Sequence, residues 1–379
     1  MTELSGIDPI TGRMQTVAFG AGEAISAIAE GGDADCYLAA GLVDLQVNGY
    51  AGFDLNDGAV DAETVSKLAR VMLEHGVTTF LPTVITETED NICKALAAIA
   101  QAREADPVVR EMVPGIHVEG PFISPIDGPR GAHKASAVRA PDIEEVRRWQ
   151  NACGGLVRLI TLSVHWPESE AIIAAARREG IAIAIGHTDA TAEQIHGAAE
   201  AGAQLSTHLG NGAAATLPRH PNFIWAQLAD DRLTATFIAD GHHLPADTLK
   251  AMVRAKGLER SILVSDVAAL GGLKPGLYDQ AIGGQVELTA EGRLGIAGTP
   301  YLAGAARNLN EGIVSAMALT GLPLADILPL ATENPGRFAD GRGRIERGGR
   351  ADFFRFRIIP GQGALEVVDV WLDGEKVVG

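Results

Sequence analysis

Short, continuous apolar runs recur along the middle of the chain, and stretches with helical periodicity separate them. Because these runs do not alternate with polar residues, each predicts a strand buried on both faces of a parallel sheet. Eight such strands are predicted, at residues 42–47, 78–83, 113–118, 157–164, 181–185, 204–207, 234–238 and 262–264. Eight strands that alternate with helices predict an α/β fold, a (β/α)8 TIM barrel. A doubly wound open sheet is the alternative, but no Gly-x-Gly-x-x-Gly follows an early strand.

The intervening helices carry start and stop signals. Apolar residues between positions 61 and 74 fall on one face, and Gly76 stands just beyond them. Thr191 and Gln194 form a capping-box pattern at the start of a helix that ends at Gly202. Residues 168–179 begin acidic and end basic, as the helix dipole favours, and residues 246–256 repeat the pattern.

The two ends of the chain follow a different pattern. Residues 1–40 and 340–379 contain short, weakly alternating segments that are punctuated by glycine and lack helical periodicity. Because the termini of a domain usually lie close together, we expect both ends to form one small β-sandwich domain. Residues 41–339 then form the barrel.

Composition narrows the possible partners and the compartment. The 379 residues include 31 Lys and Arg against 48 Asp and Glu, a net charge of −17. Nucleic acid and anionic membranes would repel such a surface, so neither is expected as a partner. Cys36, Cys93 and Cys153 lie far apart without a CxxC motif, which argues against a disulfide framework or a thiolate zinc site. With no signal-peptide pattern and no apolar run of spanning length, we expect a cytoplasmic protein.

Ionisable residues stand at the ends of several predicted strands. Glu119 ends the third strand, His187 follows the fifth, His208 ends the sixth, His243 follows the seventh and Asp266 ends the eighth. The C-terminal ends of barrel strands meet at one face, where active sites lie. One carboxylate and two imidazoles form a His2Glu metal set, with Asp266 beside it as a candidate base. The alternative is a group of unrelated polar residues on surface loops.

A further histidine and two serines have side chains that could take part in chemistry. His117 lies two residues before Glu119, on the same side of its strand, where it could be a ligand. We favour a histidine that is satisfied by hydrogen bonds one layer deeper. Ser163 and Ser265 lack a Gly-x-Ser-x-Gly frame, so a serine hydrolase is not expected.

Seven motifs along the chain together match a known family. They are GLVDLQVNG at 41–49, HGVTTFLPTVIT at 75–86, GIHVEGPF at 115–122, GHTDA at 186–190, STHLGN at 206–211, IADGHH at 238–243 and VSD at 264–266. With these motifs the chain resembles the amidohydrolase superfamily and, within it, the N-acetylglucosamine-6-phosphate deacetylases. Residues 343–352 are similar to the superfamily segment that returns to the β domain.

The resemblance implies a reaction and a metal. Family members hydrolyse the N-acetyl group of N-acetylglucosamine 6-phosphate, which gives glucosamine 6-phosphate and acetate. The implied ligands are Glu119, His187 and His208, and the implied base is Asp266. We expect one divalent metal ion per chain, zinc first, with iron, manganese or cobalt as alternatives.

The first strand departs from the superfamily pattern. Most members carry His-x-His there, which helps to bind a second metal, whereas this chain has Gln46 and Asn48. Amides are poor zinc ligands, so we expect a mononuclear site in which Gln46 and Asn48 orient a water molecule from the second ligand shell.

The same resemblance implies residues that contact the substrate, an amino sugar phosphate. His133 matches a catalytic histidine that is placed against the bound substrate. Asn211, Gly212, Arg219 and His243 match the sugar-phosphate site. The family also suggests a homodimer, in which Arg219 reaches the neighbouring subunit's site.

The pocket loops leave the substrate open. The segment at 207–213 lacks the aromatic residue and the methionine that are usual in the family. The alternatives are another N-acetyl amino sugar, phosphorylated or not, or an N-acyl amino acid. A non-catalytic barrel that binds a metal and senses a sugar is a further alternative, but it would not need a base at Asp266.

Overall fold

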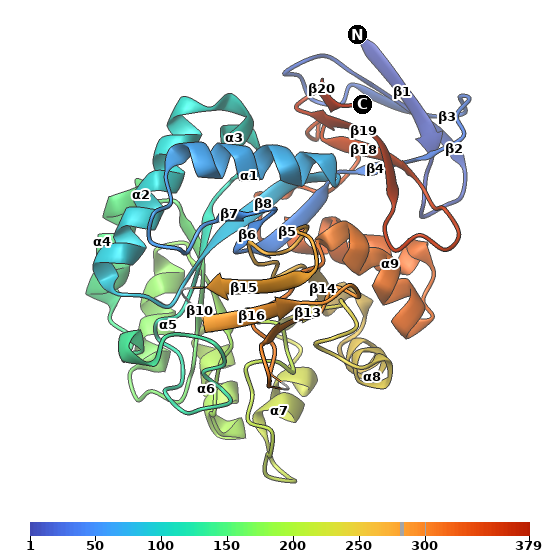
Figure 1. Ribbon diagram of the computed structural model, residues 1–379. Coiled ribbons are helices and arrows are strands. Elements are labelled where there is room, and N and C mark those ends of the chain that lie inside the picture. Colours follow the sequence, from blue (N-terminus) through green and yellow to red (C-terminus); the bar gives the residue numbers. More distant parts are fainter. Residues whose placement is uncertain (281–283, 300) are drawn as a thin grey trace.

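The computed structural model describes residues 1–280, 284–299 and 301–379. Its central sheet has eight strands in the order β14-β13-β12-β11-β10-β9-β8-β5. The strands are β5 (Leu42–Val47), β8 (Val77–Ile85), β9 (Ile116–Glu119), β10 (Val157–Leu162), β11 (Ala182–Ile185), β12 (Leu205–Ser206), β13 (Thr234–Ile238) and β14 (Ser261–Val264). All neighbouring strands pair in parallel. The amide of Asp266 donates to the carbonyl of Gln46 (3.0 Å), which joins the two ends of the sheet into a barrel (Figure 1).

The predicted barrel and all eight of its predicted strands are confirmed. The largest difference at a strand start is in β9, which begins at Ile116 and not at residue 113, because the short helix α3 ends only at Met112 and residues 113–115 connect it to the strand. Both faces of these strands are buried: one cluster of apolar side chains fills the barrel and a larger one packs against the helices.

Helices surround the barrel and cover the outer faces of its strands (Figure 1). They are α1 (Ala62–Glu74), α2 (Glu89–Ala105), α3 (Pro107–Met112), α4 (Ile143–Cys153), α5 (Ser169–Arg178), α6 (Ala192–Ala201), α7 (Phe223–Ala229), α8 (Ala246–Lys256), α9 (Leu309–Thr320), α10 (Leu324–Ile327) and α11 (Glu333–Gly336). The 3-10 turns in the described part of the chain are η1 (Ala135–Ala137), η2 (Leu258–Arg260) and η3 (Leu328–Ala331). The predicted capping box at Thr191 and Gln194 is present at the start of α6.

Both ends of the chain contribute to a second, seven-stranded sheet. Its order is β20 (Glu375–Val378), β19 (Glu366–Leu372), β18 (Phe353–Arg357), β4 (Tyr37–Ala40), β1 (Thr2–Ile7), β2 (Met14–Phe19) and β3 (Ala27–Glu30). The rings of Phe19 on β2 and Trp371 on β19 lie 5.5 Å apart, although four strand spacings separate them along the sheet. The sheet therefore curls over its own apolar face. The division of the chain at residues 40 and 340 stays a prediction.

Two small sheets that were not predicted lie near the barrel. One is the hairpin of β6 (Gly49–Tyr50) and β7 (Phe53–Asp54). The other is antiparallel and consists of β15 (Gly276–Gln280), β16 (Gly284–Leu288) and β17 (Leu294–Ile296). A separate apolar cluster packs against the three-stranded sheet and includes residues of it: Leu270, Val286, Leu288, Leu294 and Ala306.

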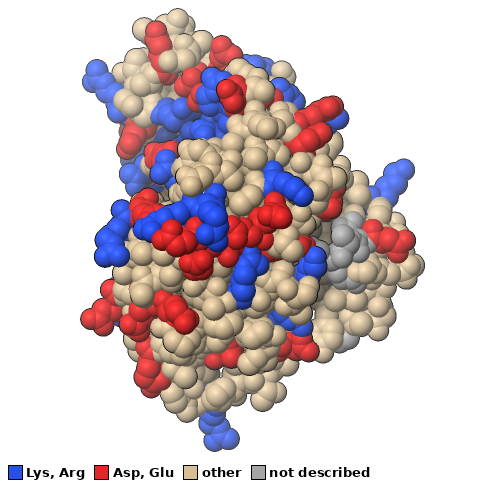
Figure 2. All heavy atoms as spheres, turned by 90° about the vertical axis from the view of Figure 1, so that its left-hand side faces the viewer, with Lys and Arg blue, Asp and Glu red and all other residues tan. Residues whose placement is uncertain are grey.

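Charged side chains of both signs are interspersed on the surface that carries α2 and α4 (Figure 2). Arg148 of α4 pairs with Glu89 of α2, and Arg147 of α4 pairs with Glu144 and Glu179. This view shows no extended basic face. Among the described helices, none has the length and apolar character needed to span a membrane.

Candidate active site

A cavity of about 1140 Å³ opens at the C-terminal ends of the barrel strands. Glu119, His187, His208 and Asp266 all line it, as the strand-end prediction required. Apolar residues from the loop after β14 and from the three-stranded sheet form another part of its wall, among them Leu270, Leu273, Val286 and Leu294.

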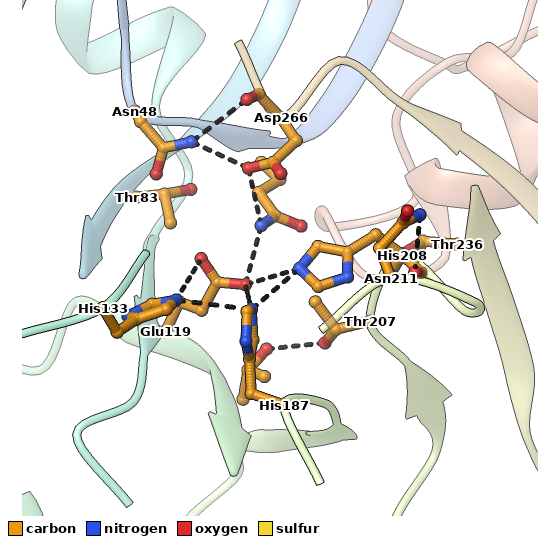
Figure 3. A network of polar contacts seen from close by, with 12 residues as sticks. Asn48, Thr83, Glu119, His133, His187, Thr207, His208, Asn211, Thr236 and Asp266 are labelled. Atoms are coloured by element: carbon orange, nitrogen blue, oxygen red, sulfur yellow. Dashed lines mark hydrogen bonds and ion pairs between the residues drawn. The ribbon is translucent and has the colours of Figure 1, made fainter. Parts of the chain in front are cut away.

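Three predicted ligands meet at one point in this cavity (Figure 3). The Oε1 atom of Glu119 lies 2.9 Å from Nε2 of His208 and 3.3 Å from Nε2 of His187. The two Nε2 atoms lie 3.1 Å from each other. All three side chains are buried.

The hydrogen-bond partners of these two rings show which of their nitrogens could face a cation. The Nδ1 atom of His187 lies 2.8 Å from the carbonyl oxygen of Pro129, which can only accept. In the neutral ring the proton is therefore on Nδ1, and the lone pair of Nε2 faces an acceptor oxygen of Glu119. The Nδ1 atom of His208 has no partner among the described residues. One carboxylate and two imidazoles in this arrangement fit a divalent transition metal.

His133 lies beside the same group. Its Nε2 atom is 3.3 Å from Nε2 of His187 and 3.9 Å from Oε2 of Glu119, close enough for these three residues to share an ion. Its Nδ1 atom is 2.8 Å from the hydroxyl of Thr86. Burial lowers the pKa of His133 to about 3, so this imidazole is neutral.

Three site residues adopt left-handed backbone conformations. The φ angles are 48° at His187, 27° at His208 and 51° at Asp266, and each residue lies two positions after the end of its strand. Such conformations cost about 1–3 kcal/mol for residues with a side chain and persist where the surroundings enforce them, often at active sites.

Asp266 is connected to the cluster through amide side chains. Nε2 of Gln46 donates to Oε1 of Glu119 (2.9 Å) and to Oδ1 of Asp266 (2.8 Å). Nδ2 of Asn48 also donates to Oδ1 of Asp266 (2.8 Å). Burial, together with the charge of Glu119, raises the pKa of Asp266 to about 6. The carboxyl is therefore mainly ionised at neutral pH and able to accept a proton.

Three of the four predicted substrate residues also line the cavity: Asn211, Gly212 and His243. Asn211 donates to the carbonyl of His208 (3.1 Å). A Cβ at Gly212 would lie 2.7 Å from Nδ1 of His187, so a side chain there would displace a ligand. Nδ1 of His243 lies 2.7 Å from Oδ2 of Asp240, which fixes this ring and leaves its Nε2 without a hydrogen-bond partner among the described residues.

Arg219 is not brought to the cavity of its own chain. It lies exposed on the segment between β12 and α7, which extends at the lower edge of Figure 1. Among the described residues that line the cavity there is no Lys or Arg. Carboxylates other than Glu119 and Asp266 do line it, namely Asp54, Asp57, Asp127 and Asp279. A phosphate in this cavity would need positive charge from elsewhere.

The favoured interpretation of His117 is confirmed. Its Nδ1 lies 3.1 Å from the carbonyl of Leu45 and its Nε2 2.8 Å from the hydroxyl of Thr161, one layer below Glu119. Sequence reasoning missed two buried residues of this region, Thr86 and Asp44. A carboxylate within the otherwise apolar start of β5 was the available signal for Asp44.

Comparisons with known proteins agree with this geometry. Residues 37–377 match the Amidohydrolase family. The chain is 33% identical to the N-acetylglucosamine-6-phosphate deacetylase of Bacillus subtilis (strain 168), over 84% of this chain and 80% of that protein. It is 32% identical to the N-acetylgalactosamine-6-phosphate deacetylase of Shewanella sp. (strain ANA-3), over 89% and 82%. A mutant N-acetyl-D-glucosamine-6-phosphate deacetylase from Mycobacterium smegmatis, solved with N-acetyl-D-glucosamine-6-phosphate, has a TM-score of 0.87 and 27% identity, over 100% and 99%.

Proposed function

We propose that this chain, which belongs to the amidohydrolase family, hydrolyses N-acetylglucosamine 6-phosphate to glucosamine 6-phosphate and acetate. The observation that carries the proposal is the convergence of Glu119, His187 and His208 at the end of the barrel, with Asp266 joined to them through Gln46. A binding protein would have no use for a base in that position.

Glu119, His187 and His208 hold one divalent metal ion in this proposal, with zinc as the first candidate and iron, manganese or cobalt as alternatives. When bound, such an ion polarises the amide carbonyl and lowers the pKa of water toward ~7. A second ion would need imidazole ligands at positions 46 and 48. These positions hold the amides of Gln46 and Asn48, which donate to Asp266, and this supports a site for a single ion.

Asp266 moves the proton. Both amides donate to its Oδ1 atom, so we assign proton uptake from the attacking water to Oδ2. The same carboxylic acid then protonates the leaving amine, which cannot depart as an anion. We assign the hydroxyl proton of Thr86 to Nδ1 of His133 (2.8 Å) and not to the more distant carbonyl of Glu119 (3.4 Å), which leaves a proton on Nε2 of this neutral imidazole for the carbonyl oxygen of the substrate.

Asn211, the backbone of Gly212 and His243 bind the sugar, and Arg219 of a second copy of the chain supplies charge for the phosphate. This assignment is supported by the exposed position of Arg219 and by the absence of Lys and Arg among the described residues of the cavity wall. It makes a homodimer the active form. The three free cysteines agree with a cytoplasmic location.

The decisive experiment measures acetate release by metal-analysed protein. The substrates are N-acetylglucosamine 6-phosphate, N-acetylgalactosamine 6-phosphate and unphosphorylated N-acetylglucosamine. We expect the first to have the highest kcat/KM. Preference for the neutral sugar would favour the second candidate, a deacetylase of another amino sugar, which the acidic lining of the cavity allows. Release from none of them would contradict the proposed function.

A further inference from the structure

Asp44 is a fully buried carboxyl to which the proposed reaction assigns no role. It lies on β5 between Val43 and Leu45, which are equally buried in the apolar interior of the barrel. Burial raises its pKa to about 7, and the nearby charge of Asp266 adds to the shift. Placing an acidic group here costs stability, so the residue needs a reason other than packing.

The reason lies at the junction where the barrel closes. β5 and β14 are the two ends of the strand order. Just beyond β14, backbone bonds join the two chain segments, from the amide of Asp266 to the carbonyl of Gln46 (3.0 Å) and from the amide of Asn48 to the carbonyl of Val267 (2.9 Å). Deeper in the junction, Oδ1 of Asp44 accepts from the amides of both Ser265 and Gln46, each at 3.2 Å.

We propose that Asp44 is a positioning residue for the hydrolysis. By holding the backbone amides of Ser265 and Gln46 on one oxygen, it sets the carboxylate of the neighbouring Asp266 against the side-chain amide of Gln46. The inference rests on the proposed function, because Asp266 is the base in that reaction.

The hydroxyl of Ser265 makes a second link across the same junction. It donates to the carbonyl of Gln46 and accepts from the amide of Val267, both at 3.2 Å. Asp266 thus lies between two backbone amides whose acceptors belong to Asp44 and Ser265. These two hydrogen bonds hold the backbone on both sides of Asp266. Such support is required because a residue at a φ of 51° keeps that conformation only where its neighbours enforce it.

A small displacement of Asp266 would be costly, because proton transfer requires hydrogen-bond distance in the reacting complex. Loss of Asp44 should therefore lower kcat. It should leave metal binding and KM largely unchanged, because Glu119, His187 and His208 are held by other strands. Support residues around metal sites typically account for about 10–100-fold in activity, and we expect a loss in that range.

The test compares three variants on N-acetylglucosamine 6-phosphate. Asp44→Ala should lower kcat about 10–100-fold, change KM less than about threefold and keep the wild-type metal content. Asp44→Asn retains an oxygen for the two amides and should recover most of kcat. The matched control is Asp369→Ala, which removes a buried carboxylate that pairs with Arg355 in the terminal sheet. This control should lower thermal stability and leave kcat of the folded protein unchanged.

A double variant separates positioning from general stability. If Asp44 acts through Asp266, adding Asp44→Ala to Asp266→Asn should lower the residual rate less than about twofold. If Asp44→Ala lowered kcat by the same factor in the wild-type protein and in Asp266→Asn, Asp44 would act independently of Asp266, and this result would overturn the proposal. Wild-type kcat in Asp44→Ala, or equal losses in Asp44→Asn and Asp44→Ala, would overturn it too.

The outcome remains decisive if Asp44→Ala does not fold. Ser265→Ala removes the second link across the junction and should lower kcat several-fold at unchanged KM. The positioning role is refuted if Ser265→Ala has the wild-type kcat and Asp44→Asn is inactive. Failure of the proposed function is a different result, in which the wild-type protein releases no acetate from any substrate.

Discussion

At the scale of single residues, the partner of each ring nitrogen assigns the histidines of the barrel to different tasks. Nδ1 of His187 faces a backbone carbonyl, which directs the lone pair of Nε2 at the cluster. Both nitrogens of His117 are occupied, so this ring can only support the strands around it. His243 is oriented by the carboxylate of Asp240. Sequence position alone could not distinguish these roles, because each depends on atoms from another strand or loop.

Asp266→Asn should keep its metal and lose about 10²–10⁴ in kcat, because an amide cannot accept the proton of the attacking water. In the wild-type enzyme kcat/KM should fall as the pH drops below about 6, where the raised pKa of Asp266 leaves the base protonated. A pH profile of both proteins with metal analysis checks this. Asp266 is not the base if the variant turns over at the wild-type rate or retains the same acid limb.

His208→Ala should lose the metal. Nε2 of His208 lies 2.9 Å from Glu119 and 3.1 Å from His187, so its removal leaves two of three assigned ligands. Metal analysis of the pure wild-type protein should give about one ion per chain, falling sharply in the variant. Two tightly held ions per wild-type chain would contradict the mononuclear site.

At the scale of elements, the parts that were predicted are those whose burial is uniform. The barrel strands are largely buried and most of their residues are apolar, so short continuous apolar runs in the sequence identified all eight. β15 and β16 were missed because much of their surface is exposed and their sequence is mixed, although Val286 and Leu294 of this sheet line the cavity. His133 could be placed only by resemblance, since it stands on a long connection between β9 and α4 whose course follows from tertiary contacts.

The capping box of α6 gives a prediction at this scale. The hydroxyl of Thr191 accepts from the amide of Gln194, whose side chain accepts from the amide of Thr191 (2.8 Å). Thr191→Ala should lower the free energy of unfolding by about 0.5–2 kcal/mol, and Thr191→Ser, which keeps the hydroxyl, should lower it much less. Chemical denaturation of both variants measures this. Equal losses would show that the methyl group, not the cap, is what stabilises the helix.

At the scale of the whole molecule, the protein and its proposed substrate, a sugar phosphate, both carry net negative charge. The chain carries −17, and the described residues of its cavity wall include carboxylates but no Lys or Arg. A sugar phosphate would approach this opening against repulsion unless a cation is delivered to it. Arg219 is exposed on a segment that extends from the barrel, which suits delivery to another subunit (Figure 1).

Arg219→Ala should therefore raise KM for the phosphorylated sugar about 10–100-fold, the range for losing a hydrogen bond to a charged group. Activity on the unphosphorylated sugar should barely change. Steady-state kinetics on the two sugars measure this, and equal losses on both would contradict phosphate recognition by Arg219.

Mixing two variants that are each impaired on the phosphorylated sugar tests where Arg219 acts. A hybrid of Arg219→Ala with Asp266→Asn contains one site with an intact base from the first chain and an intact arginine from the second. Random exchange in a two-fold symmetric dimer should restore about a quarter of the wild-type rate at low substrate concentration. The control mixture, Asp266→Asn with His208→Ala, should restore nothing, because both residues belong to the site of one chain. Hybrids that form but stay inactive in the first mixture would show that Arg219 does not serve the neighbouring site, and the phosphate would then have to be recognised by His243 and Asn211 alone.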